Sequence, residues 1–157
     1  MKSEILYEEQ LKKHLFGGEA FMPLKEMLKM IPYDQVGIKP QNLPYSFFEI
    51  FYHIWFTQND ILEYCLKPDY SAPKWPDDYW PSESSPAGPE AWERLQKDFF
   101  EDREKFEELI TSGEKELIVP VPSNRNHSIF RELLLVIEHS AYHTGQLFII
   151  LRLLGLK

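Results

Sequence analysis

The segment from Ser128 to Leu154 constrains the fold of this chain more than any other part of the sequence. It is apolar on most sides at helical spacing, and a helix of that kind must be buried by other elements. Its most apolar stretch, Leu133 to Leu151, contains Glu138, His139, His143 and Gln146. A lipid-facing span does not tolerate such side chains at mid-depth. The sequence therefore predicts a buried helix at the centre of a water-soluble helical protein.

Other helices are expected to cover this one. Apolar residues recur at helical spacing over residues 3–16, 46–66 and 90–112, and a short helix is expected between Pro23 and Pro32. Ser46 and Glu49 match a capping box, which marks the start of the second long helix. Long linkers at residues 32–44 and 67–89 suit crossovers better than an up-and-down arrangement. The predicted fold is all-α, a four-helix bundle with long crossover loops and almost no strand.

The third long helix carries a dense charge run, which we interpret as its solvated face without a function. The residues are Glu101, Asp102, Arg103, Glu104, Lys105, Glu107 and Glu108. The segment Leu117–Val119 is β-prone and is expected to be a short extended connector.

Composition excludes several classes of partner. The formal net charge is -8, so we expect neither nucleic acid nor an anionic membrane surface to bind. The single cysteine, Cys65, cannot form an internal disulfide, and its apolar surroundings in sequence predict a buried, inert thiol. Residues 1–10 show no signal-peptide core. We therefore expect a cytoplasmic protein.

Three histidines are the candidate functional residues. His139 and His143 are four apart on the most apolar helix, so both imidazoles lie on one helix face and can reach one metal ion. The residue after His139 is a serine, which excludes the zinc-protease motif with its catalytic glutamate. The alternative is a pair of hydrogen-bonded core histidines. The pair alone supports the two interpretations equally.

His53, in the middle of the second long helix, favours the metal. A third imidazole from a neighbouring helix completes a three-nitrogen site with an open position, the arrangement of catalytic rather than structural sites. Neutral imidazoles select a divalent transition metal, with Zn or Ni favoured here, over Mg or Ca. Helical spacing places four candidate supporting residues near the histidines: Gln146, Glu132, Glu49 and Thr57. For each of these four residues, an ordinary role on the surface or in a helix cap is an equally good interpretation.

The linker at residues 67–89 holds half of the prolines and several aromatic residues, among them Trp75, Tyr79 and Trp80. A loop of this length is functional or disordered in most proteins, and the aromatic residues argue against disorder. We expect an ordered lid over the substrate site, with a plain crossover between parallel helices as the alternative.

The order and spacing of these features resemble the DinB-like, or YfiT-like, superfamily, which is distinct from the DNA polymerase that shares the name. The resembling stretches are residues 17–18, 44–55, 58–62, 72–81, 127–132 and 138–147. The resemblance covers nearly the whole chain and implies one domain over residues 1–157. It implies a bundle with crossovers, homodimers, and metal ligands at the positions of His53, His139 and His143. Characterised relatives include transferases that use a low-molecular-weight thiol such as bacillithiol, and a mycothiol-dependent isomerase.

Three functions are compatible with the sequence. The first is a metal-dependent S-transferase that joins a low-molecular-weight thiol cosubstrate to small electrophiles. The second is a hydrolase that uses metal-bound water, for which the sequence offers no obvious general base. The third is a metal-binding stress protein without catalysis. In the first two cases the partner is a small-molecule substrate.

Overall fold

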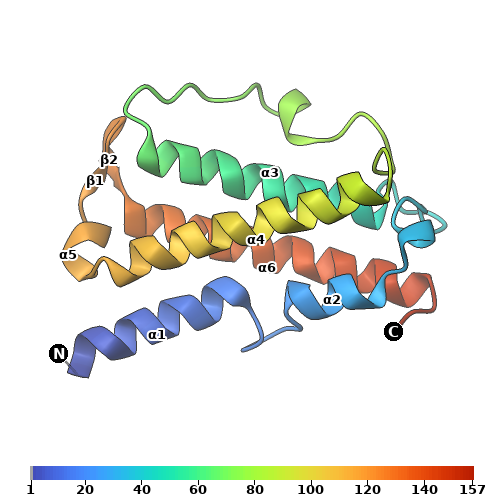
Figure 1. The fold of residues 1–157 in the computed structure, drawn as a ribbon, viewed down its shortest axis with the longest axis horizontal. Coiled ribbons are helices and arrows are strands. Elements are labelled where there is room, and N and C mark those ends of the chain that lie inside the picture. Colours follow the sequence, from blue (N-terminus) through green and yellow to red (C-terminus); the bar gives the residue numbers. More distant parts are fainter. Residues whose placement is uncertain (1) are drawn as a thin grey trace.

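The computed structural model describes residues 2–157, and almost all of its regular structure is helical (Figure 1). The helices are α1 (Lys2–Phe16), α2 (Leu24–Met30), α3 (Phe47–Leu66), α4 (Pro89–Thr111), α5 (Glu114–Leu117) and α6 (Ile129–Leu153), with 3₁₀ turns η1 (Tyr33–Gln35) and η2 (Asp77–Tyr79). The prediction of an all-α chain is confirmed. Met1, the first residue of the predicted domain, lies outside the described residues.

Local sequence signals set the ends of the long helices. At the start of α3 the Ser46 hydroxyl accepts the backbone N–H of Glu49, and the Glu49 carboxylate accepts the backbone N–H of Ser46. This capping box is the one that the sequence predicted. At the end of α1, Gly17 and Gly18 take positive φ values of 80° and 105°, which stop the helix.

The helices α3, α4 and α6 lie side by side, and α3 packs against both of the others (Figure 1). Helix α1 packs on α4 and α6, and α2 continues along α6. The segment from residue 67 to residue 88 runs back along α3, so that α3 and α4 run in the same direction (Figure 1). This long connection therefore spans the length of the helix that carries His53.

Two hydrophobic clusters fill the interior, one toward each end of the long helices. The first includes Phe51 of α3 and Phe99 of α4, and the second includes Leu62 of α3 and Phe106 of α4. Buried polar side chains lie between the two clusters along the helices, namely Gln58, Asp102, Arg103, Ser140, His143 and Thr144, and the buried His53 lies at the edge of the first cluster. The middle of the protein is thus a polar layer between two apolar cores.

This polar layer corrects the interpretation of the charge run on α4 as a wholly solvated face. Asp102 and Arg103 are 3% and 2% exposed. Asp102 accepts hydrogen bonds from Asn59 and Lys105, and Arg103 donates to the Ser140 hydroxyl at 2.6 Å and to the Leu15 carbonyl. Buried polar groups need such partners, and here α1, α3 and α6, together with Lys105 of α4 itself, supply them.

The region before α6 also differs from expectation. The extended connector predicted at residues 117–119 is not found in that form, because Leu117 is the last residue of α5. An antiparallel pair follows, β1 (Pro120–Val121) with β2 (Asn124–Ser128), and Ser128 then caps α6 by accepting the backbone N–H of Arg131. Within residues 2–157, no helix is both long enough and apolar enough to cross a membrane.

Candidate metal centre

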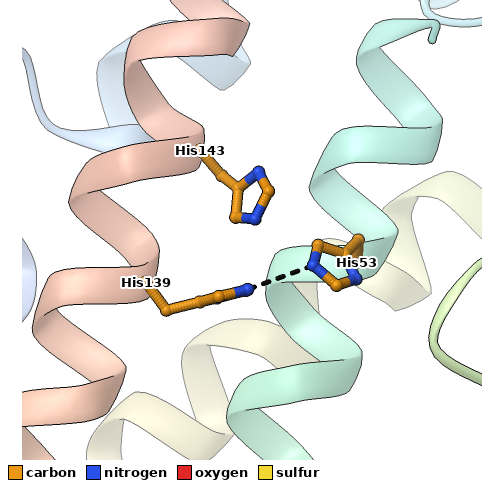
Figure 2. A group of neighbouring side chains, drawn as sticks. All are labelled: His53, His139 and His143. Carbon is orange, nitrogen blue, oxygen red and sulfur yellow. Dashed lines mark hydrogen bonds between the residues drawn. The ribbon is translucent and has the colours of Figure 1, made fainter. Parts of the chain in front are cut away.

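His53 of α3 and His139 and His143 of α6 point toward one another between the two helices (Figure 2). One ring nitrogen from each histidine lies within 4.8 Å of the other two. His53 and His143 are 2% and 8% exposed, and His139 is half-buried. Two elements far apart in sequence therefore bring the three predicted imidazoles into one small volume.

The hydrogen-bond partners determine which nitrogen of each ring faces this volume. His53 Nδ1 lies 3.1 Å from the carbonyl oxygen of Tyr79, and His143 Nδ1 lies 2.6 Å from Oε1 of Gln146. Carbonyl oxygens only accept, so both Nδ1 atoms carry the hydrogen and donate it. The Nε2 atoms of His53 and His143 are therefore unprotonated, and each carries a lone pair, as metal ligands require.

His139 completes the set through the same atom. Its Nε2 lies 3.1 Å from Nε2 of His53 and donates a hydrogen to it in the metal-free chain (Figure 2). If His53 and His139 held one metal ion, the hydrogen between them would be lost, and the remaining His139 proton would belong on Nδ1.

The electrostatics of the site favour neutral rings. Burial lowers the pKa of His53 from 6.5 to about 4, against the opposing effect of its bond to Tyr79, and the nearby His143 lowers it further. Burial, with His143 and His53 nearby, lowers the pKa of His139 to about 3. Burial also lowers the pKa of His143, although its bond to Gln146 opposes the shift. Neutral imidazole is the form that binds metals.

The spacing of the nitrogens fits one transition-metal ion. Two nitrogens bound to one ion at about 2.0–2.1 Å stand about 2.9–3.4 Å apart. The 3.1 Å between His53 and His139 lies in that range. The other separations lie within 4.8 Å. Three converging nitrogens without a carboxylate form a donor set for Zn, Ni, Cu or Fe(II).

The aromatic segment of the long connection lies against the histidines. The Trp80 ring stacks on His53 with 4.0 Å between centroids and 3° between planes, and Trp75 lies 6.2 Å from the same ring. Trp80 is half-buried, whereas Trp75 is 66% exposed. The backbone carbonyl of Tyr79 holds His53, so this segment both covers and orients the site.

A carboxylate on α3 anchors the same segment. Tyr79 donates its hydroxyl hydrogen to Asp60 at 2.6 Å, and Tyr70 donates to the other oxygen of Asp60 at 2.7 Å. Burial and these bonds raise the pKa of both tyrosines. The sequence analysis missed Asp60, although it stands seven residues after His53 and therefore near the same face of the helix.

The sequence profile of the DinB superfamily matches residues 20–147. The chain belongs to the DinB superfamily. No curated protein and no solved structure matches the chain. The family assignment, made from the sequence as a resemblance, is thus confirmed.

In the described part of this DinB-superfamily chain, one of the four candidate supporting residues is hydrogen-bonded to His53, His139 or His143. Gln146 accepts from His143. The other three have different neighbours. Glu132 interacts with Arg131 and His127, and Glu49 serves the α3 cap and pairs with Lys39. The Thr57 hydroxyl is buried without a hydrogen-bond partner in the described structure.

The remaining histidines lie outside the cluster. His127, at the end of β2, is hydrogen-bonded to the hydroxyl of Tyr64 at 2.9 Å and lies 3.6 Å from the buried Glu132. His14 is exposed near the end of α1. Glu138, next to His139 in sequence, is exposed, and helical spacing places it on another side of α6.

Proposed function

We propose that this DinB-superfamily protein is a metal-dependent S-transferase, which joins the sulfur of a low-molecular-weight thiol to a carbon of a small electrophile. The thiol loses its proton, and the leaving group of the electrophile departs with the bonding electrons. His53, His139 and His143 hold one divalent transition-metal ion, with Zn or Ni favoured. When bound, such an ion lowers the pKa of a coordinating thiol and so supplies a thiolate at neutral pH.

The observation that carries this proposal is the convergence of three imidazole nitrogens, two of them only 3.1 Å apart, in a largely buried site. Two of the rings are held by acceptors at Nδ1, the Tyr79 carbonyl and Gln146. Metal-binding histidines are typically oriented in this way. Core histidines that serve packing alone do not need three nitrogens facing one point.

The aromatic segment supports a small apolar electrophile as substrate. Trp80 stacks on His53, and Trp75 packs at 5.0 Å on the Tyr79 ring. Together they present aromatic surface beside the three nitrogens, where an apolar substrate gains binding energy and water is excluded. The carboxylate of Asp60 on α3 accepts a hydrogen bond from the Tyr79 hydroxyl and so holds this segment in place.

We further propose that α1, α3, α4 and α6 form the four-helix bundle expected of the family, and that the chain is a homodimer. Large apolar side chains lie exposed along one side of α6: Leu134, Tyr142, Ile149 and Leu153. A second copy that covers this side would bury them. Sedimentation equilibrium tests the dimer, and a monomer at micromolar concentration contradicts it.

The first experiment measures metal content. Untagged protein is purified without added metal and analysed by inductively coupled plasma mass spectrometry, beside His143→Ala and His14→Ala. We expect about one Zn or Ni per chain in the natural protein and in His14→Ala, and a strong loss in His143→Ala. No metal in the natural protein, together with no uptake of added Zn or Ni, would refute the metal centre.

The second experiment separates the proposed reaction from its alternatives. The metal-loaded protein is incubated with 1-chloro-2,4-dinitrobenzene and, in turn, bacillithiol, mycothiol, glutathione or cysteine. Turnover above the uncatalysed rate that disappears in His143→Ala supports the transferase. Activity on esters without a thiol would indicate the hydrolase instead. Metal binding without any turnover would indicate a non-catalytic metal-binding protein.

A further inference from the structure

A cavity lies away from the three histidines, among α1, α2, α4 and α6. Its volume is about 470 Å³, within the range of about 300–1,000 Å³ found for small-molecule sites. Apolar side chains supply much of its wall: Leu15, Phe21, Leu24, Phe99 and Phe100. None of the three histidines lines it. Ser140 and Thr144 do, because α6 turns these residues away from His139 and His143.

Arg103 of α4 also lines this cavity and is 2% exposed. Its guanidinium donates to two neutral acceptors, the Leu15 carbonyl and the Ser140 hydroxyl, and lies 5.0 Å from the centre of the Phe99 ring. Its Nε is buried without a hydrogen-bond partner in the described structure. The guanidinium thus keeps unused donor capacity.

The charge of Arg103 is likewise uncompensated. Among the residues that the structure describes, no carboxylate forms an ion pair with it, although Asp102 and Glu104 are its neighbours in sequence. Burial lowers its pKa to about 9, so the side chain remains a cation at neutral pH. A buried charge without a counterion is costly, and proteins pair such charges.

The carboxylates around the cavity do not fill this role. Glu104 is exposed, Glu107 pairs with Lys12, and Glu26 pairs with Lys29. They lie where the cavity meets solvent, while Arg103 is on its buried side. The arrangement has an apolar, partly aromatic wall, an inner cation and a polar rim, which matches a molecule with an apolar body and one anionic end.

We infer that this cavity binds a small monocarboxylate with an apolar body, whose carboxylate pairs with Arg103. The site is independent of the three-histidine centre, and it does not depend on the proposed transferase function. Its occupant touches Ser140 and Thr144, the neighbours of His139 and His143 in α6.

The test uses the full chain, zinc-loaded and zinc-free, in isothermal titration calorimetry with 4-phenylbutyrate and octanoate. The neutral control ligand is 4-phenylbutan-1-ol. We expect each carboxylate to bind about tenfold or more tightly than the alcohol, the value of one charge-assisted contact. We expect Arg103→Met to lose that preference and the exposed Arg152→Met to keep it. Removal of zinc should change the affinity by less than about twofold, since the cavity holds no metal ligand.

Several results would overturn the inference. The first is a dissociation constant above about 1 mM for both carboxylates, and the second is equal affinity for acid and alcohol. The third is a preference for the acid that survives in Arg103→Met. The fourth is binding only to the zinc-loaded protein. The last result would place the carboxylate at the histidines. If Arg103→Met does not fold, the Nε–H resonance of Arg103 in the natural protein decides. It must shift on saturation with 4-phenylbutyrate and stay unchanged with the alcohol.

Discussion

The contact between Gln146 and His143 allows a quantitative test of the metal centre. Gln146→Leu keeps the size of the side chain but removes the oxygen that accepts from His143 Nδ1 at 2.6 Å. The buried N–H of His143 then loses its partner, at a cost of about 1–3 kcal/mol. Part of this cost falls equally on the metal-free protein and does not affect metal binding.

The remainder appears as weaker metal binding. A ring bound to a cation is a stronger donor than a free neutral ring, so the contact to Gln146 is worth more in the metal-bound protein. Loss of such a supporting contact lowers metal affinity by about 10–100-fold, or about 1.4–2.7 kcal/mol. We therefore expect the zinc dissociation constant of Gln146→Leu to rise at least tenfold.

Competition with a chromophoric zinc chelator at pH 7.5 measures this change. Gln146→Glu is the matched variant, because a carboxylate retains the acceptor and makes the ring more basic, and it should bind zinc at least as tightly as the natural protein. Gln96→Leu on α4 controls for the loss of an amide elsewhere. An unchanged zinc affinity in a folded Gln146→Leu protein would refute the view that this contact orients a ligand.

Three further predictions follow from buried groups. Ser46→Ala should lower the free energy of unfolding by about 1–2 kcal/mol in urea titrations, because the fully buried hydroxyl caps α3 and donates to the Ser84 carbonyl at 2.6 Å; an unchanged value contradicts the cap. Cys65 should not react with Ellman's reagent at pH 8 until the chain is denatured, since burial, aided by a nearby carboxylate, raises its pKa to about 12; rapid labelling of native protein would show an accessible thiol. In metal-free protein His53 and His139 have pKa values of about 4 and about 3, below the 6.5 of the unfolded chain, so the unfolded state binds more protons below pH 6.5. Their contribution to stability is therefore complete above pH 6.5 and is lost as the pH falls through 4 toward 3. Urea midpoints that fall as steeply in His139→Gln as in the natural protein would disprove this contribution.

The helices could be predicted because their signals are local. The capping box at Ser46 acts within one turn, and Gly17 with Gly18 ends α1 through backbone conformation alone. The apolar spacing of each segment then leaves one face to bury. The short pair of strands before α6 was missed, because Pro120 and Asn124 carry weak strand signals and the pairing depends on the turn between them.

The histidine cluster could be predicted in part for the same reason. The spacing of His139 and His143 fixes a shared face, and Gln146 lies three residues further along that face. Helical spacing could not exclude Glu132 or Glu49, since it specifies a face but not which neighbouring helix or loop takes the side chain. The two carboxylates interact with cations and a cap that stand closer to them than the histidines do.

The burial of Arg103 could have been predicted from helical spacing, but the charge of the side chain argues against it. Phe99, Arg103 and Phe106 stand four and three residues apart, so all three face the interior of the protein. The charge run around Arg103 hides this, because a long cationic side chain at such a position usually reaches solvent with its end. Here the last turn of α1 presents the Leu15 carbonyl and α6 presents the Ser140 hydroxyl, and both accept hydrogen bonds from the buried guanidinium. Only the packing of three elements decides between these two outcomes for an arginine, and that packing also creates the cavity beside it.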